Sequence, residues 1–140
     1  MNFRFGKLCS LVLFIVALTI SGIAQAQPAP APAGPKEMRF LVYFNEFSAY
    51  LSPRAKTTIA RAAKAAKAAG AKAITVQARA SATGTAVTNK YLAQTRSSIV
   101  ADQLEADGIT RSNIQEEPIG QTGSSDPSVF NRRVDIIIGH

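Results

Sequence analysis

The pattern of hydrophobic and polar positions changes several times along the chain after residue 36. Four short segments are rich in β-branched, aromatic or other apolar residues, which is typical of buried strands. They comprise residues 39–44, 73–80, 114–119 and 133–138. Residues 120–129 contain glycine, serine, aspartate and proline, and this composition predicts a loop between the last two strands.

Two longer segments have the spacing of amphipathic helices, with apolar residues recurring about every 3.6 positions. The first begins with Ser52 as N-cap and Pro53 in the first turn, and it ends at Gly70. The second extends from about Ala86 to Asp107, and a glycine follows it. The resulting order, β-α-β-α-β-β, implies at least one right-handed βαβ unit. We therefore expect an α+β fold in which two main helices cover one face of a mixed sheet.

The predicted first helix is rich in alanine and has a basic outer face. Its narrow apolar stripe consists of Ile59, Ala63 and Ala66. Its outward basic residues are Arg61, Lys64 and Lys67. A solvated helix face explains these charges well, because alanine and lysine are good helix formers. A contact with an anionic surface is the alternative.

The predicted second helix places two polar residues on its inward stripe. Asn89, Leu92 and Arg96 fall on one face, which Val100 and Leu104 extend. A guanidinium carries five donors and is costly to bury unpaired. Arg96 should therefore either bind an internal partner or lie at a rim that receives an external anion. The internal candidates are Asp102, Asp135 and a loop carbonyl.

The N-terminal part of the chain has a different character. Two basic residues precede an apolar run over residues 8–24, and the small-x-small pattern of a secretory signal peptide ends at Ala26. We expect cleavage there, although a run of this length could also remain as a membrane anchor. Residues 27–36 are rich in proline and alanine, which predicts an extended linker. The folded domain is then expected over residues 37–140.

Composition narrows the classes of function. The expected signal segment, residues 1–26, holds the only cysteine, so the mature chain would have no thiol and no disulfide. Losing the two basic residues of that segment leaves 14 of the 16 basic residues against 9 acidic ones, a net charge of +5 instead of +7. This charge suits an anionic partner but is too diffuse to identify one.

Enzyme and nucleic-acid functions find little support. The single histidine is His140, the last residue, and the sequence has no recognisable catalytic triad, zinc cluster or phosphate loop. We therefore predict a non-catalytic protein without metal or cofactor. The sequence also lacks an aromatic RNA-binding motif, and export argues against a nucleic-acid partner.

From about Phe40 to Gly139 the chain resembles the OmpA-like C-terminal domain family. That family usually carries Asn-x-x-Leu-Ser-x-x-Arg-Ala on its second helix, where this chain has Asn89-Lys-Tyr-Leu92-Ala-Gln-Thr-Arg96-Ser. The terminal Asn131-Arg132-Arg133-Val134 and the opening Tyr43-Phe44-Asn45 are also similar. The resemblance implies a periplasmic domain that binds peptidoglycan and tethers the envelope to the cell wall.

One departure from the family concerns the ligand. In the family, an aspartate and the helix arginine grip the charged groups of diaminopimelate in the stem peptide, but here the aspartate position is Ser81. Arg96 could still bind a carboxylate in bidentate fashion and Asn89 could align it. Ser81 offers only a neutral hydroxyl, and Arg79, in place of a family histidine, would repel an ammonium group.

The candidate ligand-binding residues are Asn89, Arg96, Ser81, Asn45, Leu92 and Arg132. Arg132 is expected at the rim, because strand alternation puts Arg133 on the same face as Asp135. Asn45 could supply polar contacts or simply begin a turn.

Two functions remain open at this stage. The first is a non-catalytic envelope protein, in the periplasm and associated with cell wall or outer membrane, that binds diaminopimelate-containing peptidoglycan through an Arg/Asn anion clamp. The second is a degenerate domain of the same fold that serves as a structural module or binds another envelope protein. Asn89 and Arg96 favour the first function, and Ser81 favours the second.

Overall fold

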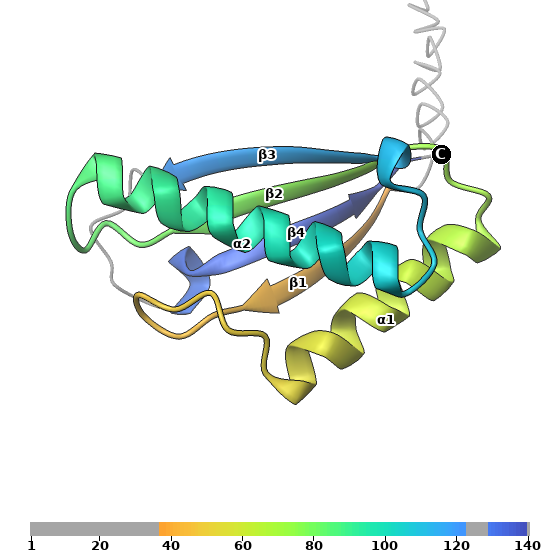
Figure 1. Ribbon diagram of the computed structural model, residues 1–140, viewed down its shortest axis with the longest axis horizontal. Helices are drawn as coiled ribbons and strands as arrows, with labels where there is room; N and C mark the ends of the chain where they lie inside the picture. The colour runs from red at the N-terminus through yellow and green to blue at the C-terminus, as the bar shows by residue number, and fades with distance from the viewer. Residues whose placement is uncertain (1–36, 123–128, 140) are drawn as a thin grey trace, which may run out of the picture. The chain divides into compact units, whose positions relative to one another are not determined.

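The computed structural model of the chain describes residues 37–122 and 129–139 (Figure 1). The expected signal segment, the expected linker and His140 lie outside the described residues. Most of the predicted loop, residues 123–128, also lies outside them. Every predicted strand and helix falls within the described part, so the element order can be compared directly.

The observed order is β-α-β-α-β-β, as predicted. The strands are β1 (Met38–Tyr43), β2 (Ile74–Ala80), β3 (Ile114–Gln121) and β4 (Arg133–Ile138). The helices are α1 (Pro53–Ala68) and α2 (Ala86–Ala106), with single 3₁₀ turns at Arg111–Asn113 and Val129–Asn131. Boundaries agree with the sequence pattern to within about two residues, the usual uncertainty of element ends.

The strands form one mixed sheet in the order β1-β4-β2-β3. Strand β4 pairs antiparallel with both β1 and β2, whereas β2 and β3 are parallel and are joined through α2. Both helices lie over the same face of this sheet (Figure 1). The predicted α+β fold is therefore confirmed.

The helix ends follow from local sequence. The Ser52 hydroxyl accepts a hydrogen bond from the Ala55 amide at 3.2 Å, and the Thr85 hydroxyl accepts one from the Thr88 amide at 3.1 Å. Each bond satisfies one of the amides that an α-helix leaves free at its start. After α2, Gly108 has a φ of 90°, a conformation that costs glycine little and so ends the helix cleanly.

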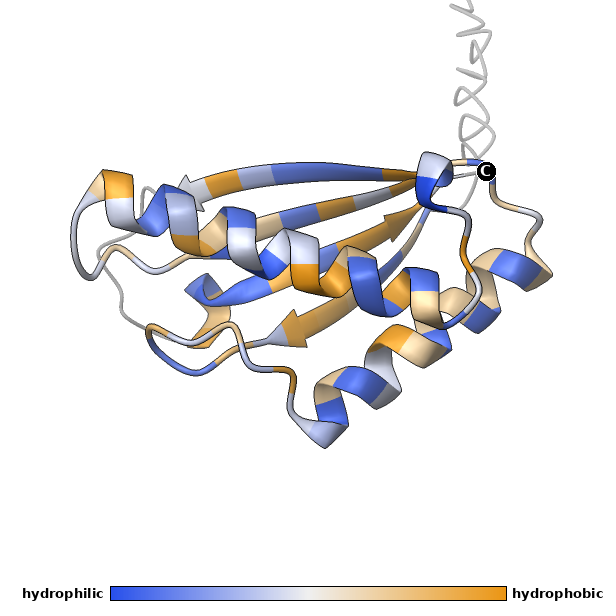
Figure 2. Ribbon diagram, in the orientation of Figure 1, coloured by the Kyte–Doolittle hydropathy of each residue, from blue (hydrophilic) through white to orange (hydrophobic). Residues whose placement is uncertain are grey.

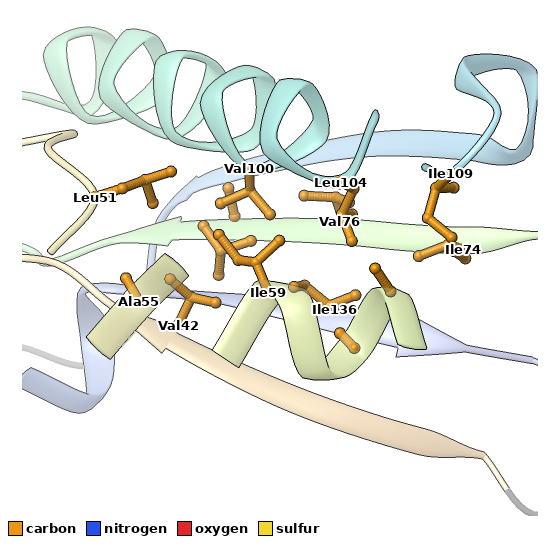
Figure 3. Close-up of a cluster of buried hydrophobic side chains, with 14 of the residues drawn as sticks. Val42, Leu51, Ala55, Ile59, Ile74, Val76, Val100, Leu104, Ile109 and Ile136 are labelled. Atoms are coloured by element: carbon orange, nitrogen blue, oxygen red, sulfur yellow. The ribbon is translucent and has the colours of Figure 1, made fainter. Parts of the chain in front are cut away.

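The hydrophobic core lies between the helices and the sheet (Figure 3). Ile59 of α1 and Val100 and Leu104 of α2 meet the inward side chains of the strands there, including Val76 and Ile136. Buried and half-buried residues alternate along β2, so this strand turns one set of side chains toward the core (Figure 2). The buried residues of α1 are Ala55, Ile59, Ala62, Ala63 and Ala66.

The opposite face of the sheet is not covered by a helix and carries a charged cluster. Asp135 is fully buried and accepts hydrogen bonds from Arg79 at 2.6 Å, Arg133 at 2.8 Å and Arg39 at 3.4 Å. The expected pairing of Arg133 with Asp135 is thus observed. Within residues 37–122 and 129–139, no helix combines the length and the apolar character needed to cross a bilayer.

Candidate functional site

One end of the sheet gathers most of the residues singled out in the sequence. Strands β1, β2 and β3 all end there, because β1 is antiparallel to β4, β4 is antiparallel to β2, and β2 is parallel to β3. The segment from β1 to α1 and the segment from β2 to α2 therefore emerge at the same end, beside the first turns of α2 (Figure 1).

Arg96 is the centre of this end of the sheet. Its side chain is completely buried, and its three nitrogens donate to backbone carbonyls: Nε to Ser48 at 2.9 Å, Nη2 to Asn45 at 2.9 Å and Nη1 to Arg79 at 3.2 Å. The guanidinium carbon lies 5.0 Å from the centre of the Phe44 ring, a cation–π arrangement. The sequence offered three internal partners for Arg96: Asp102, Asp135 and a loop carbonyl. The structure shows backbone carbonyls in this role.

The charge of Arg96 has no acidic counterpart in the described part of the chain. The ion pairs there involve Arg39, Arg79, Arg111 and Arg133, and none involves Arg96. Burial lowers the pKa of Arg96 to about 10, and the nearby positive charge of Arg132 contributes to the same shift. Arg96 therefore stays protonated at neutral pH as a buried cation that backbone carbonyls and the Phe44 ring stabilise.

Asn89 and Ser81 hold the loop between β2 and α2. The Asn89 side-chain amide donates to the Thr83 carbonyl at 3.1 Å, and the Ser81 hydroxyl accepts from the Thr83 amide at 3.2 Å. Both side chains are buried. Asn89 binds the carbonyl of Thr83 and Ser81 binds its amide, so the loop is held to α2 and to the end of β2.

The other candidate residues occupy different environments. Asn45 begins a turn, because its carbonyl accepts from the Ser48 amide at 3.2 Å as well as from Arg96. Arg132 is half-buried, and its Nε lies 3.5 Å from the Phe44 carbonyl. Leu92 is half-buried on α2. The structure thus brings Asn45, Arg132 and Arg96 together, whereas Leu92 lies beside this group without a polar contact to it.

The expectation for Arg79 was wrong. Its side chain lies on the uncovered face of the sheet, where it donates to Asp135 at 2.6 Å and to Gln77 at 2.5 Å. Only its backbone carbonyl faces Arg96. The reason is strand alternation, since the buried Ala78 and Ala80 turn toward the helices and the residue between them must turn away. Arg79 cannot repel a ligand at the Arg96 end from this position.

Sequence reasoning missed the backbone turn that encloses Arg96. Phe47, in the middle of this turn, has a φ of 50°, which is uncommon for a residue other than glycine, and its ring is exposed. A Cβ placed on Gly84 would lie 3.9 Å from the Phe47 ring, so the two loops are neighbours. No side-chain pattern could have revealed carbonyl acceptors, because every residue type provides them.

A comparison with protein-family models found a match over residues 43–132, to a family described as the OmpA family. This range includes all six candidate residues. A comparison with curated protein sequences found no match.

Several solved structures have the same fold. The OmpA-like domain of FopA1 from Francisella tularensis has a TM-score of 0.64 at 21% identity, covering 72% of this chain and 71% of that chain. The peptidoglycan-associated lipoprotein from Burkholderia pseudomallei has a TM-score of 0.63 at 22% identity, with coverages of 71% and 89%. The periplasmic domain of Helicobacter pylori MotB has a TM-score of 0.63 at 19% identity, with coverages of 76% and 74%.

Proposed function

Since this chain belongs to the OmpA family, we propose that it is a non-catalytic protein of the bacterial cell envelope whose domain binds peptidoglycan at the Arg96 end of the sheet. In this proposal residues 1–26 direct export, residues 27–36 act as a linker, and the domain tethers its attachment point to the cell wall in the periplasm. The names of two similar structures, a peptidoglycan-associated lipoprotein and a periplasmic domain, are consistent with this role.

The observation that carries the proposal is the buried charge of Arg96. A buried cation is costly unless an anion compensates it. In the described part of the chain the hydrogen bonds of Arg96 all go to backbone carbonyls, and Arg132 adds a second positive charge nearby. A carboxylate of the stem peptide would supply the missing negative charge. The planar guanidinium can bind such a carboxylate in bidentate fashion.

Access to Arg96 requires a local rearrangement. The side chain has no exposed surface, so a ligand carboxylate reaches it only if the turn at Asn45–Ser48 moves outward. The left-handed conformation of Phe47 makes this turn a less stable part of the chain. We propose that the incoming carboxylate replaces the Asn45 and Ser48 carbonyls as the acceptor for Arg96, with Asn89 keeping the neighbouring loop in place.

The serine at position 81 sets the strength of binding. A diaminopimelate group also carries an ammonium, for which Ser81 offers no charge, and its hydroxyl already accepts from Thr83. A missing charge-assisted hydrogen bond costs about 1.5–3 kcal/mol, or roughly 10- to 100-fold in affinity. We therefore expect weaker binding than a pocket with an aspartate would give.

A second candidate function is a domain of the same fold that no longer binds peptidoglycan and contacts another envelope protein or has a structural role. The observation that favours it is that the polar groups of Arg96, Asn89 and Ser81 all have internal partners. In this case Arg96 would serve to hold the segment between β1 and α1 in place.

Binding to purified peptidoglycan separates the two functions. Residues 32–140 form one compact unit and are suitable for co-sedimentation with cell wall and for titration with a soluble muropeptide. Saturable binding supports the first function.

A Ser81→Asp variant should bind more tightly, because an aspartate can still accept from the Thr83 amide while adding a charge. A matched Ser98→Asp variant on the outer part of α2 should leave affinity unchanged. No binding by the wild-type domain, with binding restored by Ser81→Asp, would support the second function.

A further inference from the structure

The outer face of α1 carries a concentrated positive charge. Its exposed basic residues are Arg54, Lys56, Arg61, Lys64 and Lys67. The sequence contains no aspartate or glutamate between Glu46 and Asp102, so no acidic residue of α1 or of its neighbours along the chain offsets them. Hydrophilic positions are spaced along the whole length of α1 (Figure 2).

These cations differ in their partners from four arginines elsewhere in the domain. Arg39, Arg79, Arg111 and Arg133 all form ion pairs with carboxylates. On α1, no basic residue forms an ion pair with a carboxylate in the described part of the chain. Lys67 donates to the backbone carbonyl of Asp107 at 2.9 Å. The charge of this face is therefore uncompensated.

The position of two of these residues also works against helix stability. The first turn of α1 contains no acidic residue and instead has Arg54 and Lys56. Positive charges near a helix N-terminus interact unfavourably with the helix dipole. A sequence optimised only for helix stability would have acidic residues in this first turn. The stability of α1 therefore does not explain why its charges are all positive.

The shape of the face indicates a flat, repeating anionic partner. The cations extend over about 20 Å from Arg54 to Lys67, at 1.5 Å per helical residue. The exposed positions between them are small, such as Thr57 and Ala60, and they offer no large apolar side chain for insertion or for a protein hot spot. A bilayer surface rich in anionic phospholipid presents many phosphates at this scale and attracts basic residues electrostatically.

We propose that the outer face of α1 lies against the headgroups of an anionic phospholipid bilayer, which positions the domain at a membrane surface. This face shares no residue with the candidate peptidoglycan site. The expected export of the chain makes such a membrane surface available and keeps nucleic acid away.

Vesicle binding by residues 32–140, which lack the apolar run, tests this assignment. We expect co-flotation with vesicles of equal parts phosphatidylglycerol and phosphatidylcholine and none with phosphatidylcholine alone. Binding should weaken between about 50 mM and about 300 mM salt, because screening shortens the reach of surface charges. Millimolar inorganic phosphate at constant ionic strength should not compete, since a single phosphate cannot contact several cations along the helix.

Charge-matched variants localise the surface. Arg61→Gln with Lys64→Gln should weaken partition roughly 10- to 30-fold. Lys90→Gln with Arg111→Gln removes the same net charge elsewhere and should change partition much less. Circular dichroism and thermal unfolding would verify that both variants are folded. Equal losses in the two variants, no binding to the anionic vesicles, or loss of cell-wall binding in the α1 variant without vesicle binding would each overturn the assignment.

Discussion

At the scale of single residues, Arg96 joins three separate parts of the chain. It is on α2, yet it donates to Arg79 near the end of β2 and to Asn45 and Ser48 in the turn between β1 and α1. One side chain thus organises the end of the sheet where the candidate ligand site lies. Any ligand that binds Arg96 would act on all three segments at once.

Replacing Arg96 should therefore reduce stability. Arg96→Ala removes one hydrogen-bond donor from each of the carbonyls of Asn45, Ser48 and Arg79 and creates a cavity, so we expect the free energy of unfolding to fall by about 3 kcal/mol. Arg96→Lys keeps the charge but can reach fewer carbonyls and should cost less. Urea unfolding followed by circular dichroism measures both. A loss below about 1 kcal/mol in the alanine variant would mean that water replaces the guanidinium easily.

Asp135 is the second residue on which the fold depends strongly. It is fully buried and faces Arg39, Arg79 and Arg133. Asp135→Asn would leave Arg79 and Arg133 without their anion, whereas Arg39 would keep Glu37 at 2.8 Å. We expect the free energy of unfolding to fall by about 3 kcal/mol, limited by the partial exposure of the arginines. Glu117→Gln, on the same face but exposed, should change stability by less than about 0.5 kcal/mol. Similar effects in the two variants would contradict the structural importance of the cluster.

At the scale of elements, the alanines of α1 set how closely this helix approaches the sheet. Ala62, Ala63 and Ala66 are almost completely buried against the core. A small side chain at these positions leaves room for Val42 and Ile136, which pack below the helix. The alanine-rich composition is thus a packing requirement on one side of the helix and a matter of helix propensity on the other.

Enlarging an inner alanine should show this difference. Ala63→Leu overfills the space between α1 and the sheet and should lower the free energy of unfolding by about 1–3 kcal/mol. Ala60→Leu adds the same volume on the exposed side of α1 and should have an effect below about 0.5 kcal/mol. Thermal unfolding of the two variants makes the comparison. If Ala60→Leu were as harmful as Ala63→Leu, the assigned orientation of α1 would be wrong.

At the scale of the whole molecule, the charge on Arg96 affects how the free energy of unfolding depends on pH. Its pKa is lowered to about 10, so the folded state holds this proton less tightly than the unfolded chain does. The cost of burying the charge is therefore fully present below pH 10 and declines as the pH rises above about 10. Between about pH 6 and pH 9 Arg96 is protonated in both the folded and the unfolded state, so it does not make the free energy of unfolding depend on pH.

Binding of a carboxylate ligand at Arg96 should accordingly stay constant between about pH 6 and pH 9. Titration of the domain with muropeptide at three pH values in this range measures the affinity. A loss of binding of tenfold or more across the range would indicate that a different group carries the interaction.

Much of the architecture was predictable because it depends on short-range patterns. The caps at Ser52 and Thr85, the two-residue alternation in β2 and the helical stripe of α2 all act within a few residues, so the printed sequence already contains them. The pairing of Arg133 with Asp135 was accessible for the same reason, since both lie on one face of one strand.

The chemistry of the candidate site was only partly accessible in this way. The sequence by itself determined the order of elements, the one-sided sheet and the inward position of Asn89 and Arg96. Only the tertiary structure decided that Arg96 binds backbone carbonyls from Asn45 and Ser48 and that the Arg79 side chain turns toward Asp135. The physical reason is that carbonyl acceptors are the same in every residue and that long-range partners are chosen by the packing of segments far apart in the chain.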